Sequence, residues 1–119
     1  MNKRDLEERL INLAVLIIKL VEDMPNTKAA NHLAGQLLRS GTSPALNYGE
    51  AQSAESGSDF THKIKVVLKE LRETLVCLKI IYKTQLFTAE EKIKVILKET
   101  DELVAIFVSS AKTADLNRK

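Results

Sequence analysis

Apolar residues recur along the chain in steps of four and three, the spacing that places side chains on one face of an α-helix. The first series predicts a helix from about residue 5 to residue 24, and Pro25 stops it because proline has no backbone N–H to donate. A second apolar line lies beside the first, so this face is wider than one neighbouring helix can cover. The two lines are Leu6, Leu10, Leu13, Ile17, Leu20 and Met24, and Ile11, Ala14, Ile18 and Val21.

The second apolar series contains a proline, Pro44, and this allows two interpretations. The helix can end near Ser40, because the proline ring crowds the preceding turn at a cost of about 3 kcal/mol. Alternatively it can bend near Pro44 and continue to about Gln52. We favour the bent, continuous helix because Leu46 and Ala51 extend the apolar pattern.

Polar residues mark the starts and ends of the remaining helices. The third helix is predicted to end near residue 85, residues 53–58 read as a loop, and residues 113–119 as a frayed tail. The expected N-cap residues are Asn26 or Thr27 for the second helix, Ser56 or Ser58 for the third, and Thr88, in a capping box with Glu91, for the fourth.

Four helices joined by short connections predict an all-α fold, an antiparallel up-down-up-down four-helix bundle. The 119 residues suit one domain spanning residues 1–119, and the 4% aromatic content requires an aliphatic core. Several apolar residues lie outside the predicted core lines, so we expect further burial between subunits in a homo-oligomer. These residues are Val15, Leu16, Val66, Val76 and Ile80.

The single cysteine and the hydropathy pattern bear on the location of the protein. Cys77 has no partner for a disulfide within the chain, and it lies in an apolar run where it is expected to be inert. The longest unbroken apolar run, residues 13–18, is far shorter than the roughly 20 residues of a membrane span, and no signal peptide is visible. We therefore expect a cytoplasmic protein with no membrane association.

A line of polar residues runs along the second predicted helix, in steps of four, four and three. Two interpretations are open: a hydrogen-bonded network that fixes helix or subunit register, which we favour, or a ligand-facing site. In the first case the arginine needs a carboxylate if it is buried, and Glu70 or Glu73 on the third helix can supply one. The line consists of Arg39, Ser43, Asn47 and Glu50.

Positive charge is concentrated in one segment, although the net charge of the chain is only +2. Residues 63–98 contain nine Lys or Arg against four Asp or Glu, and a row of cations can bind nucleic acid by neutralising phosphates. The alternative is a solvated face with helical pairs such as Lys69–Glu73 and Lys98–Glu102. No aromatic-rich platform for stacking single strands is present. The candidate RNA- or DNA-binding residues are Lys65, Lys69, Arg72, Lys79, Lys83, Lys94 and Lys98.

Enzyme chemistry has little support in the sequence. The chain has no P-loop, no dinucleotide-binding fingerprint and no zinc-ligand spacing. A carboxylate-bridged metal bundle needs Glu-x-x-His on two helices, and Asp59-x-x-His62 is a single imperfect match. We therefore expect a protein that is not an enzyme and needs no metal or cofactor.

Two segments together resemble a bacterial family of four-helix bundle proteins, first noticed as reading frames inside intervening sequences of ribosomal RNA genes. The second segment spans residues 59–74 and is similar to the family pattern DFIHKLxxALKEARET. Two departures are visible: Ala51 stands where the family has glycine, and Val76-Cys77 replaces an aromatic residue. The first segment is similar to QLxRAxxSIPxNIAEG and reads Gln36-Leu37-x-Arg39-Ser40-x-x-Ser43-Pro44-x-x-Asn47-x-x-Glu50.

The resemblance implies an antiparallel four-helix bundle, and some members of the family form five-fold toroidal assemblies. The accessory protein of diversity-generating retroelements belongs to the same group and uses a basic surface to bind nucleic acid and a reverse transcriptase. By this resemblance the chain is expected to form a homo-oligomer, with a pentamer as one form, and to bind RNA, DNA or a nucleic-acid enzyme. The alternative is a structural scaffold whose partner is another protein.

Overall fold

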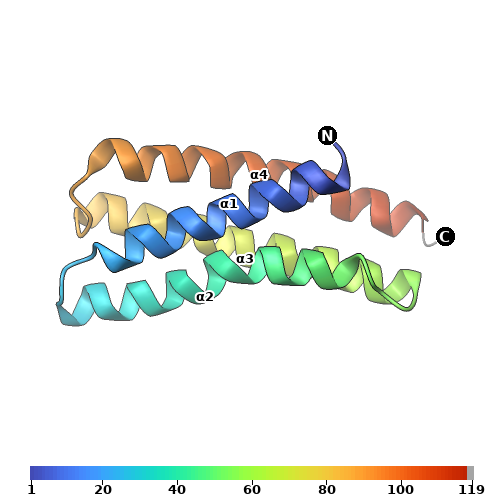
Figure 1. Cartoon of the computed structure of the whole chain (residues 1–119), viewed down its shortest axis with the longest axis horizontal. Coiled ribbons are helices and arrows are strands. Elements are labelled where there is room, and N and C mark those ends of the chain that lie inside the picture. Colours follow the sequence, from blue (N-terminus) through green and yellow to red (C-terminus); the bar gives the residue numbers. More distant parts are fainter. Residues whose placement is uncertain (118–119) are drawn as a thin grey trace.

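Four helices make up the protein in the computed structural model, which describes residues 1–117 (Figure 1). Successive helices run in opposite directions around one elongated bundle of 48 × 23 × 20 Å, and the described residues contain no strand. The predicted all-α four-helix bundle is therefore confirmed. The helices are α1 (Lys3–Glu22), α2 (Lys28–Ala51), α3 (Gly57–Thr84) and α4 (Glu90–Asn117).

The core is built from the apolar lines that the sequence pattern predicts. Buried residues of all four helices form one cluster, and the wide apolar face of α1 contributes Leu10, Leu13, Ile17 and Leu20. The second line of α1 is only partly covered within the chain: Ala14 and Val21 are half-buried, whereas Ile11 and Ile18 are exposed. Around the bundle, α2 packs closely on α3 and α3 on α4, whereas α1 and α4 touch much less. α1 and α3 lie diagonally across the bundle.

α2 passes through Pro44 without a break and ends at Ala51. The continuous helix is thus confirmed against the interpretation that it ends near Ser40, while the bend near Pro44 stays a prediction.

A glycine about one turn before Pro44 sets the distance between α1 and α2. A Cβ atom on Gly41 would lie 2.8 Å from Cγ2 of Ile17, which is itself fully buried. The two helices can approach this closely because Gly41 has no side chain.

Side-chain caps start three of the helices. The hydroxyl of Thr27 accepts the N–H of Ala30 at 3.1 Å, and that of Ser56 accepts the N–H of Asp59 at 3.0 Å. For α2 and α3 the N-cap is therefore one of the two residues predicted for that position: Thr27 and not Asn26, and Ser56 and not Ser58. α1 starts two residues before the predicted position, because the side chain of Asn2 accepts the N–H of Asp5 at 2.9 Å.

Two predictions about α4 are wrong within residues 1–117. α4 begins at Glu90, so Thr88 lies one residue too early to be its N-cap, and the predicted capping box with Glu91 is not formed. The Tyr82 hydroxyl instead donates to Glu90 Oε1 at 3.0 Å and ties the first turn of α4 to α3. The tail from residue 113 is helical as far as Asn117, because Ala114 packs into the core. The last two residues of that predicted tail lie outside the described part.

Candidate functional site

The polar line on α2 faces α3, and its arginine bridges both predicted carboxylates. Arg39 Nη1 donates to Glu70 Oε2 at 2.8 Å, and Nη2 donates to Glu73 Oε2. The Glu70 side chain is only 8% exposed, whereas that of Arg39 is 53% exposed. The hydrogen bond to Glu73 and the charge of Glu70 raise the pKa of Arg39. A single guanidinium thus compensates one buried carboxylate and one at the edge of the seam.

The other members of the polar line make local contacts. Asn47 Nδ2 donates to Ser43 Oγ at 2.8 Å within α2, and Lys63 Nζ of α3 donates to Glu50 Oε1 at 2.7 Å. The hydrogen bond from Lys63 to Glu50 raises the pKa of Lys63. Each member of the line thus has a hydrogen-bond partner on α2 or α3, an arrangement that fits the structural interpretation of the line.

A buried hydroxyl pair that the sequence patterns do not indicate completes the α2–α3 seam. Ser40 and Thr74 are both fully buried, and their hydroxyl oxygens lie 3.0 Å apart. Thr74 Oγ1 also lies 2.8 Å from the carbonyl oxygen of Glu70. Each hydroxyl carries one proton, so Thr74 can donate to that carbonyl while it accepts from Ser40. Both residues fall inside the segments that carry the family resemblance. Each buried hydroxyl supplies the hydrogen-bond partner that the other needs.

Five of the candidate nucleic-acid residues form one row on the exposed face of α3. We call this row the basic stripe, and all five side chains are exposed. Its steps of four, three, seven and four residues keep every member on one side of the helix over about 27 Å. Within residues 1–117 only Lys65 has an ion-pair partner, Asp115 at 3.0 Å. The basic stripe consists of Lys65, Lys69, Arg72, Lys79 and Lys83.

The helical ion pairs expected on these faces are not formed within the described residues. Glu73 turns towards Arg39 instead of Lys69, and Glu102 lies 3.4 Å from Arg9 Nη2 instead of pairing with Lys98. These two pairs, which illustrated the alternative of a solvated face, are absent because each acid pairs with an arginine on a neighbouring helix. As a result no glutamate of α3 pairs with the basic stripe, whose one ion pair within residues 1–117 joins Lys65 to Asp115 of α4.

The two candidate lysines on α4 lie beside one end of the basic stripe. Two contacts set the register between the helices: Tyr82 meets Glu90, and Lys65 meets Asp115. Because α3 and α4 run antiparallel, this register places Lys94 and Lys98 of α4 level with residues from about 74 to 86 at the end of α3. Lys94 Nζ lies 3.4 Å from Glu90, whose charge raises the pKa of Lys94. The structure thus brings all seven candidates onto the α3–α4 side of the bundle.

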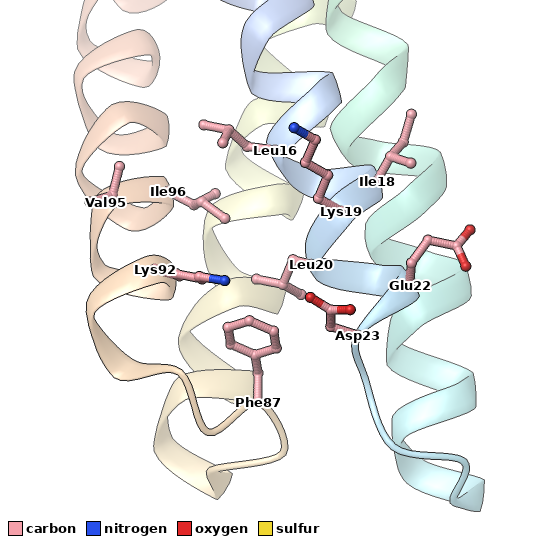
Figure 2. Close-up of a pocket in the computed structure, with 10 residues that line it drawn as sticks. All are labelled: Leu16, Ile18, Lys19, Leu20, Glu22, Asp23, Phe87, Lys92, Val95 and Ile96. Atoms are coloured by element: carbon pink, nitrogen blue, oxygen red, sulfur yellow. The ribbon is translucent and has the colours of Figure 1, made fainter.

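The opposite seam, between α1 and α4, is open over part of its length. Arg9 closes one end, because its Nε donates to Glu99 Oε2 at 2.9 Å. Towards the other end a groove of about 490 Å³ remains between the helices (Figure 2). In Figure 2, Lys92 extends from α4 into the space between the helices, and Lys19 lies on α1. Its apolar lining is Leu16, Ile18, Leu20, Phe87, Val95 and Ile96.

The potential metal ligands and the cysteine are the remaining residues of chemical interest. No group of three or more His, Cys, Asp or Glu within residues 1–117 is arranged to hold a metal ion. Cys77 is buried at the α2–α3 seam, and burial raises the pKa of its thiol. No helix in the described part of the chain is long and apolar enough to cross a membrane.

The fold and its seams define a small antiparallel four-helix bundle with a polar α2–α3 seam, an open α1–α4 groove and a row of cations on α3. The chain belongs to the 23S rRNA-intervening sequence protein family, whose model matches residues 3–109. A solved protein of unknown function from the S23 ribosomal protein family of Bacteroides thetaiotaomicron is similar in structure. The two share 31% identity with a TM-score of 0.81, over 90% of this chain and 98% of that one. A search of curated proteins finds no match.

Proposed function

We propose that the protein is a non-enzymatic, cytoplasmic homo-oligomer that binds RNA or DNA, or an enzyme acting on them, through the basic stripe. The observation that carries this proposal is that, within residues 1–117, four of the five stripe residues have no ion-pair partner. Glu70 and Glu73 are the acids of α3 nearest to it, and Arg39 draws both towards α2. The outer face of α3 therefore keeps its positive charge.

The physical basis of binding is electrostatic. Each Lys or Arg that neutralises a phosphate releases condensed counterions, so affinity grows with the number of cations on one surface. Lys69, Arg72 and Lys79 are exposed and have no ion-pair partner within the described residues, so they are free to meet phosphates. The seven candidates on one side of the bundle give this surface a sequence-independent affinity for nucleic acid.

Assembly would multiply this surface. Ile11, Val15 and Ile18 follow one another at helical spacing on the outer face of α1 and are about 40% exposed. An apolar row of this kind is typical of a face that another subunit covers. Since α1 lies diagonally across from α3, packing through α1 would leave the basic stripe facing solvent. The family resemblance makes a five-membered ring one form of such an assembly.

Charge reversal on two opposite faces tests the binding proposal. The Lys79→Glu/Lys83→Glu variant should lose binding of short RNA and DNA in fluorescence anisotropy at low salt. The matched control is Arg4→Glu/Lys19→Glu on α1, which makes the same charge change with two exposed residues and should retain most of the affinity. Equal losses in both variants, or no binding by the unmodified protein, would rule the proposal out.

The runner-up is a scaffold that binds a protein partner, and the α1–α4 groove favours it. The groove is mostly apolar, and Val95 at its edge is 59% exposed. Light scattering distinguishes the two functions when combined with the anisotropy measurement. If the protein is a scaffold, Val95→Lys should change the size of its assembly in light scattering. Charge reversal of the basic stripe should then change neither that size nor the anisotropy of the nucleic acid probes.

A further inference from the structure

We propose that the ligand of the basic stripe is double-stranded, and that the protein holds the phosphates of both strands without reading the bases. This inference rests on the proposed function and names the class of nucleic acid. It follows from the arrangement of the cations in two rows and from the positions of the aromatic side chains.

The first observation is the pair of cation rows on adjacent helices. The basic stripe runs along α3 for about 27 Å. Lys94 and Lys98 form a shorter second row on α4, level with the part of the stripe that contains Lys79 and Lys83. Packed helix axes lie about 8–10 Å apart, so the cations of α3 and α4 form two separate lines, just as the ~6 Å and ~12 Å grooves of B-form DNA separate two lines of phosphates. Two rows at this separation can meet the backbones on the two sides of a groove, whereas a single strand offers one backbone.

The second observation is the absence of an exposed aromatic ring within residues 1–117. Tyr48, Phe87 and Phe107 are buried, and Phe60 and Tyr82 are half-buried. Proteins that bind single strands without sequence preference combine a basic groove with aromatic rings on which bases stack. Here the cations have no such platform beside them, so unstacked bases would gain little from this surface.

The chemistry of the two rows points to phosphates and not to base edges. Six of the seven cations are lysines, whose compact ammonium groups act as point charges. Base readout in the major groove commonly uses bidentate Arg, Asn or Gln, and Arg72 is the only one of the seven candidates with such a side chain. Duplex DNA and duplex RNA share the phosphate backbone, so both are candidate ligands.

One position on α3 allows a gain-of-function test. Val76 is 57% exposed and lies between Arg72 and Lys79, where the row of cations is interrupted. The Val76→Lys variant would complete the row and add one phosphate contact. Val76→Ser is the matched control, because it changes the same exposed position without adding charge.

The experiment compares four fluorescent probes in an anisotropy titration at low salt. The probes are duplex DNA and duplex RNA of about 20 base pairs, and one strand of each. At about 3.4 Å per base pair, these duplexes are longer than the basic stripe. We expect both duplexes, or one of them, to bind about tenfold tighter than the matching single strand, because the second row adds contacts to a second backbone. Scrambling the duplex sequence should leave the affinity unchanged. Val76→Lys should tighten duplex binding about fivefold and Val76→Ser should not.

The possible failures separate the two proposals. If no probe binds even at low salt, the proposed function fails and this inference fails with it. If single strands bind as tightly as duplexes and reversal of the basic stripe abolishes that binding, the proposed function stands and the duplex inference is overturned. Duplex binding that Val76→Lys leaves unchanged would also overturn it, because the contact would then lie on another face.

Discussion

The α2–α3 and α1–α4 seams of the same bundle are built in opposite ways. The α2–α3 seam is bridged by polar contacts: Arg39 with its two glutamates, the Ser40–Thr74 hydroxyl pair and the Lys63–Glu50 ion pair. The α1–α4 seam is held by Arg9 at one end and opens into an apolar groove towards the other. The polar residues of the family segment thus contact one another or α3, whereas the apolar groove and the cations on α3 carry the proposals made above.

The largest effect is expected from Arg39→Ala, which removes the cation from the closed seam. Glu70 is buried, and a buried carboxylate without its partner is strongly destabilising. The variant should unfold at a lower Tm than Arg9→Ala, because Glu99 in the open seam can turn to water. Adding Glu70→Gln to Arg39→Ala should recover part of the lost Tm, because it removes the uncompensated charge. Equal Tm losses for the two arginine variants would contradict the difference between the seams.

The hydroxyl pair gives the next largest effect. Thr74→Val leaves the fully buried Ser40 hydroxyl without its partner and should lower the free energy of unfolding by about 2 kcal/mol. Ser40→Ala should cost less, about 1 kcal/mol, because Thr74 can still donate to the Glu70 carbonyl. Urea denaturation monitored by circular dichroism measures both values, and the reverse order would show that the pair is not arranged this way.

The open seam should tolerate truncation. Val95→Ala removes a side chain that is 59% exposed and should change the free energy of unfolding by less than about 0.5 kcal/mol. The adjacent Ile96 is buried in the core, so Ile96→Ala is the control and should cost about 2–5 kcal/mol. A large loss from Val95→Ala would mean that the groove is closed in solution by another subunit.

The rate at which a cysteine in each seam is labelled compares the two seams directly. The substitutions used for it are expected to change stability least. Cys77 is buried, and its raised pKa keeps the thiolate scarce at pH 8, so iodoacetamide should react slowly until the protein unfolds. A Val95→Cys change in a Cys77→Ser background places the only thiol at the edge of the groove, where it should react at nearly the rate of a free cysteine. Mass spectrometry over time measures both rates, and fast labelling of native Cys77 would show that the α2–α3 seam opens readily.

The helices and the core could be predicted from the sequence because each depends on local spacing. The apolar line of α1 is buried where the steps of four and three place it, and the continuation of α2 through Pro44 follows from the same pattern. The family segments likewise pointed to Arg39 and its carboxylates. These features need only the helical period and the pairing of opposite charges.

Features that depend on the approach of two helices could not be predicted. The contact between Gly41 and Ile17 and the buried pair of Ser40 and Thr74 require knowledge of which faces meet. Local rules also failed where a neighbouring helix competes. Helical spacing offered Lys69 as a partner for Glu73, and the charge of Arg39 offered a second one; the structure selects Arg39 of α2. That competition leaves Lys69 of the basic stripe without an ion-pair partner within residues 1–117.

The salt dependence of nucleic acid binding tests the role of the basic stripe most directly. Log K should fall linearly with log salt concentration for the unmodified protein with a duplex DNA probe. Lys79→Ala/Lys83→Ala should make the slope shallower by about 0.9 for each phosphate contact that is lost. If the unmodified protein and this variant give the same slope, the phosphates do not contact this part of the stripe, and the proposed interface is wrong.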